Sequence, residues 1–213
     1  MISKHDLPDI NDLKRYLQSL AVLDSILSLE WDFRYYSFNL KWDNDTALAS
    51  IRNGSGDHIF FVFNRSGCLI KGFSHESLMS PFQSQNSSIL TGTTEQVSVN
   101  FREYLQEVSL IPEETTFCIW RNYSDTSWQQ GEIVYPDIND PDGSEELLSL
   151  VFTNPQQYHK WAGEYYEANI KIGSIAHIFS HKLLTQDIVT SINPQVSIDT
   201  IKDDLQEIGY PNQ

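Results

Sequence analysis

The chain has 213 residues, of which 40% are hydrophobic and 20% are charged, a composition typical of a globular protein rather than a disordered or fibrous one. Its 14 Lys and Arg residues against 29 Asp and Glu residues give a formal net charge of −15 at pH 7. Because binding to nucleic acid and to anionic membranes depends on clustered Lys and Arg, this charge argues against both partners and favours solubility or a basic protein partner.

The N-terminal segment and the cysteines indicate the compartment. Residues 1–17 lack the apolar core and small-residue cleavage site of a signal peptide, and no run reaches the roughly 18 apolar residues of a membrane span. Cys68 and Cys118 lie far apart in apolar runs, without a C-x-x-C or zinc pattern, so we expect buried, reduced thiols. These features predict a soluble, cytoplasmic protein.

The first part of the chain predicts a helix followed by strands. Apolar residues recur at helical spacing after Pro8, which indicates a helix beginning near Asp9. Residues 33–42 then alternate apolar and polar side chains, as a half-buried strand does. In "TALASIRNGSGDHIFFVFNRSGCLIKGF" (46–73), turn clusters at 53–57 and 64–67 separate three strand-like runs, a pattern typical of an antiparallel meander. The middle run is continuously apolar, so we expect it inside the sheet with both faces covered.

Sheet and helix signals continue toward the C-terminus. Residues 97–108 predict a short amphipathic helix, 115–123 a strand, and 128–135 the strand that returns beside it. From residue 143 to 210 the apolar spacing is helical, with Pro and Gly at the breaks. Strands in residues 30–135 and helices in 143–210 indicate an α+β fold, an antiparallel β-meander sheet with an N-terminal helix and a helical C-terminal half. We expect one domain over residues 1–213.

The segment "KGFSHESLMSPF" (71–82) places hydrolase-type side chains in a row after a predicted strand. Sequential neighbours rarely point at one another, and a catalytic triad needs groups that converge from different segments. A cap on a short turn, made by Ser74 or Ser77 with Glu76 near the turn's N-terminus, is therefore favoured. If the chain is an enzyme, His75 is the candidate general base and Glu76 its acid or orienting partner.

Three further motifs favour structural roles. His177 and His181 in "HIFSH" have metal-binding spacing, but the Glu that follows the first His in the zincin motif is missing. The acidic segment 135–148 does not match the ligand positions of a calcium loop, and Asp142 with Glu145 instead predicts a capping box. The glycines of 52–57 precede a strand rather than a helix, which favours a hairpin over a phosphate loop. We expect no metal and no cofactor.

Aromatic residues supply the candidate binding positions. Trp161 and Tyr165 lie one helical turn apart, with Glu164 and Glu167 on neighbouring faces. Such a pair belongs either to the core or to a patch that binds a cation or a basic peptide. Trp120, in the predicted strand 115–123, is the third candidate binding residue.

Five phrases together resemble a family of uncharacterised bacterial cytosolic proteins: "SIRNGSGDHIFFVF", "IKGFSHESLMSP", "TFCIWR", "DGSEELL" and "WAGEYYE". The resemblance extends over about residues 30–210. The family has no established activity, so the resemblance implies no catalytic role for His75, Glu76 or Trp120. Small acidic bacterial proteins of this style are similar to immunity or accessory proteins of toxin systems, which implies a protein partner.

Two functions remain open at this point. The charge, the many aromatic residues and the failure of every catalytic pattern favour a non-enzymatic cytosolic protein that binds a basic protein. The alternative is a small hydrolase-like enzyme with a pocket at the end of the meander, in which His75 acts as base.

Overall fold

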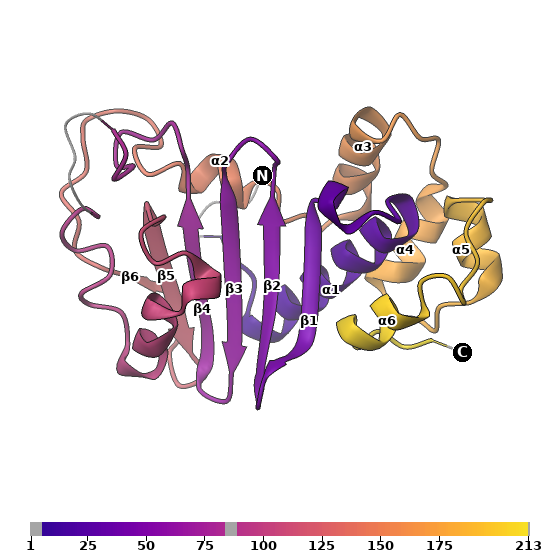
Figure 1. The fold of residues 1–213 in the computed structure, drawn as a ribbon, viewed down its shortest axis with the longest axis horizontal. Coiled ribbons are helices and arrows are strands. Elements are labelled where there is room, and N and C mark those ends of the chain that lie inside the picture. Colours follow the sequence, from indigo (N-terminus) through magenta and orange to yellow (C-terminus); the bar gives the residue numbers. More distant parts are fainter. Residues whose placement is uncertain (1–5, 84–88, 213) are drawn as a thin grey trace.

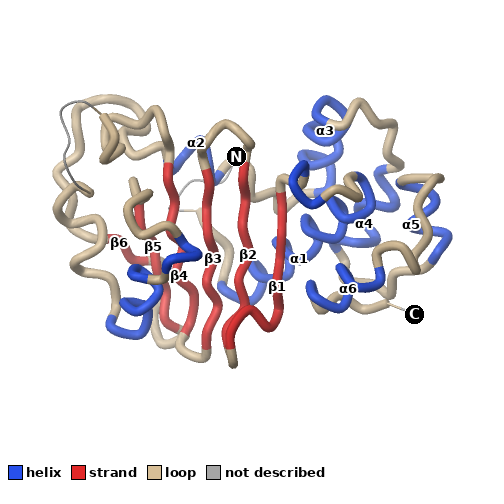
Figure 2. The backbone as a smooth tube through the Cα atoms, in the orientation of Figure 1, coloured by secondary structure: helices blue, strands red, loops and turns tan. Residues whose placement is uncertain are grey.

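The computed structural model describes residues 6–83 and 89–212, which fold around a six-stranded sheet (Figures 1 and 2). The strands are β1 (Tyr36–Asp43), β2 (Thr46–Arg52), β3 (His58–Asn64), β4 (Gly67–Phe73), β5 (Phe117–Asn122) and β6 (Gln129–Gln130). They cross the sheet in chain order, each antiparallel to the next. The predicted α+β fold and its meander are confirmed, and β3 lies inside the sheet, buried along nearly all of its length.

The β2–β3 hairpin shows why this part of the sequence could be predicted. The Asn53 side-chain oxygen accepts hydrogen bonds from the amides of Ser55 at 2.9 Å and Asp57 at 3.1 Å. Gly54 and Gly56 have φ of 73° and 104°, values that cost little only for glycine. Five consecutive residues, 53–57, therefore determine the conformation of this turn.

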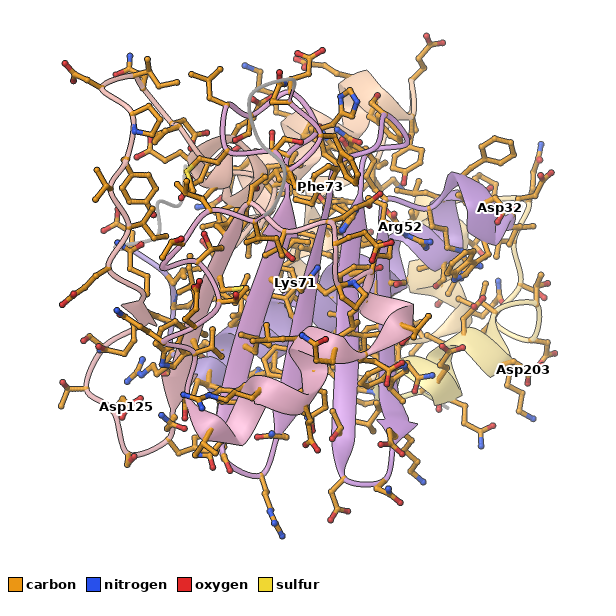
Figure 3. All side chains as sticks on the ribbon, turned by 60° about the vertical axis from the view of Figure 1, so that its left-hand side comes forward. Asp32, Arg52, Lys71, Phe73, Asp125 and Asp203 are labelled. Carbon is orange, nitrogen blue, oxygen red and sulfur yellow. The ribbon has the colours of Figure 1, made fainter. Side chains whose placement is uncertain are left out.

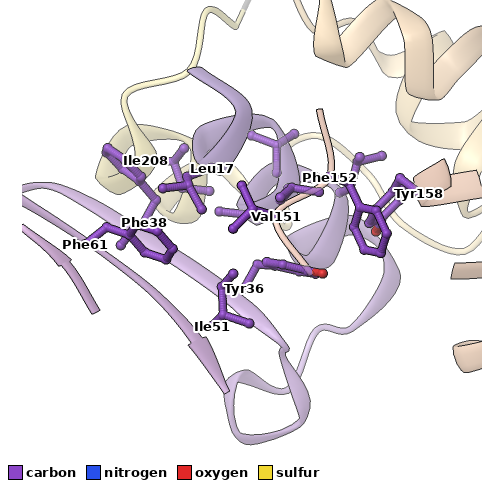
Figure 4. Close-up of a cluster of buried hydrophobic side chains, with 14 of the residues drawn as sticks. Leu17, Tyr36, Phe38, Ile51, Phe61, Val151, Phe152, Tyr158 and Ile208 are labelled. Carbon is purple, nitrogen blue, oxygen red and sulfur yellow. The ribbon is translucent and has the colours of Figure 1, made fainter. Parts of the chain in front are cut away.

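One face of the sheet packs against α1 (Ile10–Leu27) and the C-terminal helices. The Asp9 carboxylate caps α1 by accepting from the amides of Asn11 and Asp12 at 2.9 and 3.0 Å, so the predicted start of this helix is confirmed. Because side chains alternate along a strand, every second residue faces this core. Figure 4 shows part of it, including Leu17, Tyr36, Phe38, Ile51, Phe61, Val151, Phe152, Tyr158 and Ile208.

The helices of the second half are α2 (Ser144–Leu148), α3 (Pro155–Tyr165), α4 (Ile172–Phe179), α5 (Gln186–Ile192) and α6 (Lys202–Ile208). Of these, α3 to α6 lie beyond β1, whereas α2 lies at the upper end of the sheet, near β2 and β3 (Figure 1). Helix α1 contacts α4, α5 and α6, and α6 also contacts β1. None of the helices in residues 6–83 and 89–212 combines the length and apolarity that crossing a bilayer requires.

The second face of the sheet is covered only in part. The 3-10 helices η2 (Val99–Gln106) and η3 (Val108–Leu110) replace the α-helix predicted over 97–108. They bury a smaller core against β3, β4 and β5, made of Phe60, Val62, Leu69, Val97, Phe101, Tyr104, Leu105, Leu110, Cys118 and Trp120. Cys68 and Cys118 are both free thiols, buried in the first and the second core respectively. In Figure 1 the 97–110 segment lies toward β4 and β5, away from β1.

The acidic segment before α2 corrects one prediction. The cap is not the expected box of Asp142 with Glu145. Instead, the Asp140 carboxylate accepts from the amides of Glu145 and Glu146, both at 2.9 Å, and Asp142 accepts from the Ser144 amide at 3.0 Å. The reason is the left-handed Gly143 at the N-cap position, φ 72°, which turns the chain so that a residue further back reaches the helix.

Candidate functional site

A groove with a volume of about 500 Å³ lies on the second face, over β1, β2 and β3. Its volume is in the range of small-ligand pockets. The groove lies between η1 (Trp31–Phe33) on one side and the segment after η2 on the other, with the β2–β3 turn at one end. The lining residues are Trp31, Ser37, Leu48, Ser50, Arg52, Gly54, Gly56, Asp57, His58, Phe60, Ser109, Ile111 and Glu114.

Arg52 is the cation that lines this groove. Its guanidinium carbon lies 3.9 Å from the centre of the Trp31 ring. The side chain is half-buried, and no described residue accepts a hydrogen bond from its guanidinium. Burial lowers the pKa of Arg52, and the charge of Asp32, which Figure 3 labels together with Arg52, raises this pKa in part. An arginine stays protonated at neutral pH in either case. The groove therefore contains a guanidinium whose donors are not used by the described chain.

His58 and Glu114 line the groove at the same end as Arg52. Arg52 and His58 are directly paired across β2 and β3, so their side chains share one face. Burial, and next the charge of Lys71, lower the pKa of His58 to about 4, so the imidazole is neutral near pH 7. Its Nδ1 lies 3.6 Å from a Glu114 carboxylate oxygen, too far for a good hydrogen bond. Since His58 is neutral, it does not form an ion pair with Glu114.

Lys71 fixes the wall that carries Ile111 and Glu114. Its ammonium is buried and donates to the carbonyls of Leu110 at 2.9 Å, Ile111 at 2.9 Å and Glu114 at 2.6 Å. Burial lowers the pKa of Lys71 to about 8, which leaves it mostly charged at pH 7. Ile111 has φ 50°, a left-handed conformation that costs a branched residue roughly 1–2 kcal/mol. Such strain is typical of functional sites, and here it falls on a residue that lines the groove.

A corner of exposed apolar residues adjoins the groove. The five residues 29–33, here named the 29–33 corner, connect α1 to β1. Leu29, Trp31 and Phe33 are 50%, 51% and 66% exposed, and Glu30 and Asp32 alternate with them. Three large apolar side chains exposed within five residues make this segment a candidate contact surface, because exposed apolar patches mark interaction sites.

Two buried charged groups hold the 29–33 corner in place. Arg34 donates to the Ser28 carbonyl at 2.9 Å and the Leu29 carbonyl at 3.3 Å, and it forms a two-bond pair with the Asp204 carboxylate of α6 at 2.6 and 2.9 Å. On the other side, Asp24 accepts from the amides of Tyr35 at 2.7 Å and Tyr36 at 2.8 Å. The corner is exposed, yet its backbone is anchored at both ends.

Asp24 is also the acid of a buried tyrosine cluster. Besides the two amides, it accepts from the Tyr166 hydroxyl at 2.8 Å, with the Tyr158 hydroxyl at 3.5 Å. Burial raises the pKa of Asp24 to about 7, although these hydrogen bonds work in the opposite direction. The cluster joins α1 to α3, so its role is to connect elements of the core.

The structure places the two candidate catalytic residues on the surface. His75 and Glu76 are both exposed, and no described residue makes a hydrogen bond with either side chain. The His75 amide donates to Asp57 at 2.7 Å, and the Ser77 hydroxyl accepts from the Met79 amide at 3.0 Å while donating to the Pro141 carbonyl at 2.7 Å. This arrangement stabilises a turn. The catalytic role of His75 and Glu76 stays a prediction, and neither residue lines the groove.

The three candidate binding aromatics do not come together. Trp120 is buried in the second core under η2. Trp161 packs against Tyr35 and Tyr36 with ring centres 5.1 and 5.5 Å apart, and Tyr165 stacks on it at 5.0 Å. Only Tyr165 of this group presents much of its ring to solvent. Their role in binding also stays a prediction.

The histidine pair of "HIFSH" does not form a metal site. Helix α4 ends at Phe179, so His177 and His181 do not share a helical face. His177 Nε2 lies 2.9 Å from the Leu183 carbonyl, and His181 Nε2 lies 2.8 Å from the Arg15 carbonyl. Within residues 6–83 and 89–212, no group of three or more His, Cys, Asp or Glu side chains is placed to hold a metal ion.

No sequence pattern predicted the residues of the groove or of the 29–33 corner as a functional site. Arg52 opens "RNGSGD", a segment whose glycines predicted only a turn, and Glu114 lies 62 positions further along the chain. One usable signal was present: "LEWDF" alternates acidic and large apolar residues in the short connection between the helix and the first strand. Comparison with protein-family models, with curated proteins and with solved structures finds no match for this chain.

Proposed function

We propose that this chain is a binding protein, and that it recognises a basic protein partner through the 29–33 corner. The observation that carries the proposal is the exposure of Leu29, Trp31 and Phe33 within five residues, on a backbone that is anchored at both ends. Tryptophan is among the residues that contribute most to protein interfaces, because its large ring buries much apolar area with few rotatable bonds.

The anchoring supports this function energetically. A flexible apolar loop would lose conformational entropy when a partner orders it, and that loss weakens binding. Here Arg34 and Asp24 already hold the backbone on either side of the corner. The corner is therefore prepared for binding before the partner arrives.

Charge supports a basic partner. Glu30 and Asp32 lie within the corner itself, and the chain as a whole carries a formal charge of −15. Opposite charges around an apolar contact accelerate encounter and exclude partners of the same sign, more than they add affinity. The same charges disfavour nucleic acid and anionic membranes.

Matched surface variants test the proposal. The protein is immobilised as wild type, Trp31→Ala or Tyr123→Ala, the last being an exposed aromatic of similar exposure at the end of β5 (53%). A true partner is retained by wild type and by Tyr123→Ala and is lost with Trp31→Ala. With that partner purified, Trp31→Ala is expected to weaken binding roughly 30-fold, the effect of removing an interface hot spot.

Salt supplies the second measurement. Because the proposed attraction is between exposed charges, the association rate should fall as ionic strength rises. The proposal fails if no captured protein depends on Trp31, or if Trp31→Ala and Tyr123→Ala behave alike.

A further inference from the structure

The charged end of the groove contains two opposite charges, Arg52 and Glu114, whose side chains form no hydrogen bond with each other or with other described residues. Arg52 stacks on Trp31 and donates no side-chain hydrogen bond to a described residue. Glu114 receives no hydrogen bond on its carboxylate from the described residues, and the neutral His58 ring lies 3.6 Å from it. No ion pair joins Arg52 to Glu114.

The other charged groups beside them are already engaged. The Asp57 carboxylate accepts from the His75 amide at 2.7 Å and from the Asn53 side-chain amide at 2.6 Å. The three donors of the Lys71 ammonium go to backbone carbonyls. Among the described residues that line the groove, Arg52 and Glu114 are therefore the charged groups left for a ligand.

The rest of the groove is mostly apolar, with three serines among its lining residues, and it begins two residues further along β2 and β3. Ser50 and Phe60 form the next cross-strand pair on the same face after Arg52 and His58, and Leu48 follows Ser50 after another two residues. Two residues along a strand span about 7 Å. Phe60 thus offers an apolar surface about 7 Å from the charged end, and Leu48, two residues further along, extends it to about 14 Å.

We infer that the groove binds a free α-amino acid with a large apolar side chain. The planar Arg52 guanidinium, which lies over the Trp31 ring, suits a carboxylate with two parallel hydrogen bonds. The Glu114 carboxylate accepts from the α-ammonium group, and the side chain lies over Phe60, with Leu48 beyond it. A zwitterion has no net charge, so the overall charge of −15 does not repel it.

Three small molecules separate the parts of this inference without any partner protein. L-Phenylalanine has both charges, 3-phenylpropionate lacks the ammonium, and 2-phenylethylamine lacks the carboxylate. Calorimetric titration at neutral pH is expected to show that phenylalanine binds about tenfold or more tightly than either analogue, since each analogue loses one set of charge-assisted hydrogen bonds.

Two variants assign the charges to residues. Arg52→Gln should abolish the advantage of phenylalanine over 2-phenylethylamine, and Glu114→Gln should abolish its advantage over 3-phenylpropionate. Neither variant removes a side-chain hydrogen bond within the described chain, and circular dichroism verifies the fold. Arg65→Gln and Glu103→Gln, exposed residues outside the groove, are the matched controls and should bind as wild type does.

The inference is overturned if phenylalanine does not bind at millimolar concentration, if either analogue binds as tightly, or if both groove variants retain wild-type selectivity. None of these results bears on the partner proposal, because that proposal is measured by capture on Trp31.

Discussion

Replacing Lys71 by Met tests whether a buried ammonium organises the wall of the groove. Lys71 is 1% exposed, and its three hydrogen bonds hold the carbonyls of Leu110, Ile111 and Glu114. Methionine keeps an apolar stem of similar length and removes all three donors. The Ile111 carbonyl keeps the hydrogen bond from the Glu114 amide at 3.0 Å, whereas the other two carbonyls lose the bond that Lys71 supplies.

The magnitude follows from two opposing contributions. Hydrogen bonds to a charged group contribute about 1.5–3 kcal/mol each, so three give roughly 5–9 kcal/mol. Several kcal/mol are offset, because the ammonium regains its hydration when the chain unfolds. We expect Lys71→Met to lower the free energy of unfolding by about 2–4 kcal/mol. For a chain of this size, that corresponds to a Tm lower by roughly 5–15 °C.

Urea denaturation followed by circular dichroism measures the loss, and amide hydrogen exchange locates it in residues 108–114. Lys41→Met, at an exposed position on β1, is the control and should change stability by less than about 0.5 kcal/mol. If Lys71→Met is as stable as wild type, the ammonium costs as much to bury as it contributes. The wall would then depend on its apolar contacts alone.

Three further predictions concern the core and the corner. Because burial raises the pKa of Asp24 from 3.8 to about 7, the folded state binds this proton more tightly than the unfolded chain. Stability should fall as pH rises from about 4 to about 7, and urea unfolding across this range should show a smaller fall in Asp24→Asn; equal slopes would contradict the assignment. At Gly67, φ 154°, a Cβ would collide with the Arg121 carbonyl oxygen, whereas at Gly54 it would meet open space. Thermal unfolding should therefore show a loss of about 2–4 kcal/mol for Gly67→Ala and about 1 kcal/mol for Gly54→Ala, and similar losses would refute the packing argument. Arg34→Lys removes the two-bond fork to α6, so amide exchange in residues 28–34 should accelerate and stability should drop by about 1–3 kcal/mol; unchanged exchange would show that Arg34 does not hold the corner.

The sheet could be predicted because its signals are local. The turn residues at 53–57 and 64–67 determine how β2, β3 and β4 pair, and all of them lie in one continuous segment with the apolar strands. Where a contact from outside decides the structure, prediction was less accurate. The expected strand 128–135 shortens to Gln129–Gln130, since Gly131 packs against Gly92 and the Glu132 amide bonds to the Gln96 side chain at 3.0 Å.

The candidate site could not be predicted from the sequence, because its residues come together only through contacts between distant segments. Trp31, Arg52, His58 and Glu114 come from η1, β2, β3 and the segment before β5, and only the folded sheet brings them together. A motif search favours residues adjacent in sequence, such as those around His75, but these stabilise a turn on the surface. The burial that removes the charge from His58 is likewise a property of the folded protein.

Amide hydrogen exchange of the partner complex tests whether the 29–33 corner is the binding surface, because it reports which backbone segments the partner covers. We expect slower exchange in residues 28–36 on complex formation, whereas exchange in α5, and in α6 apart from the residues around Asp204, should not change. Slower exchange confined to the C-terminal helices, with the 29–33 corner unaffected, would contradict it.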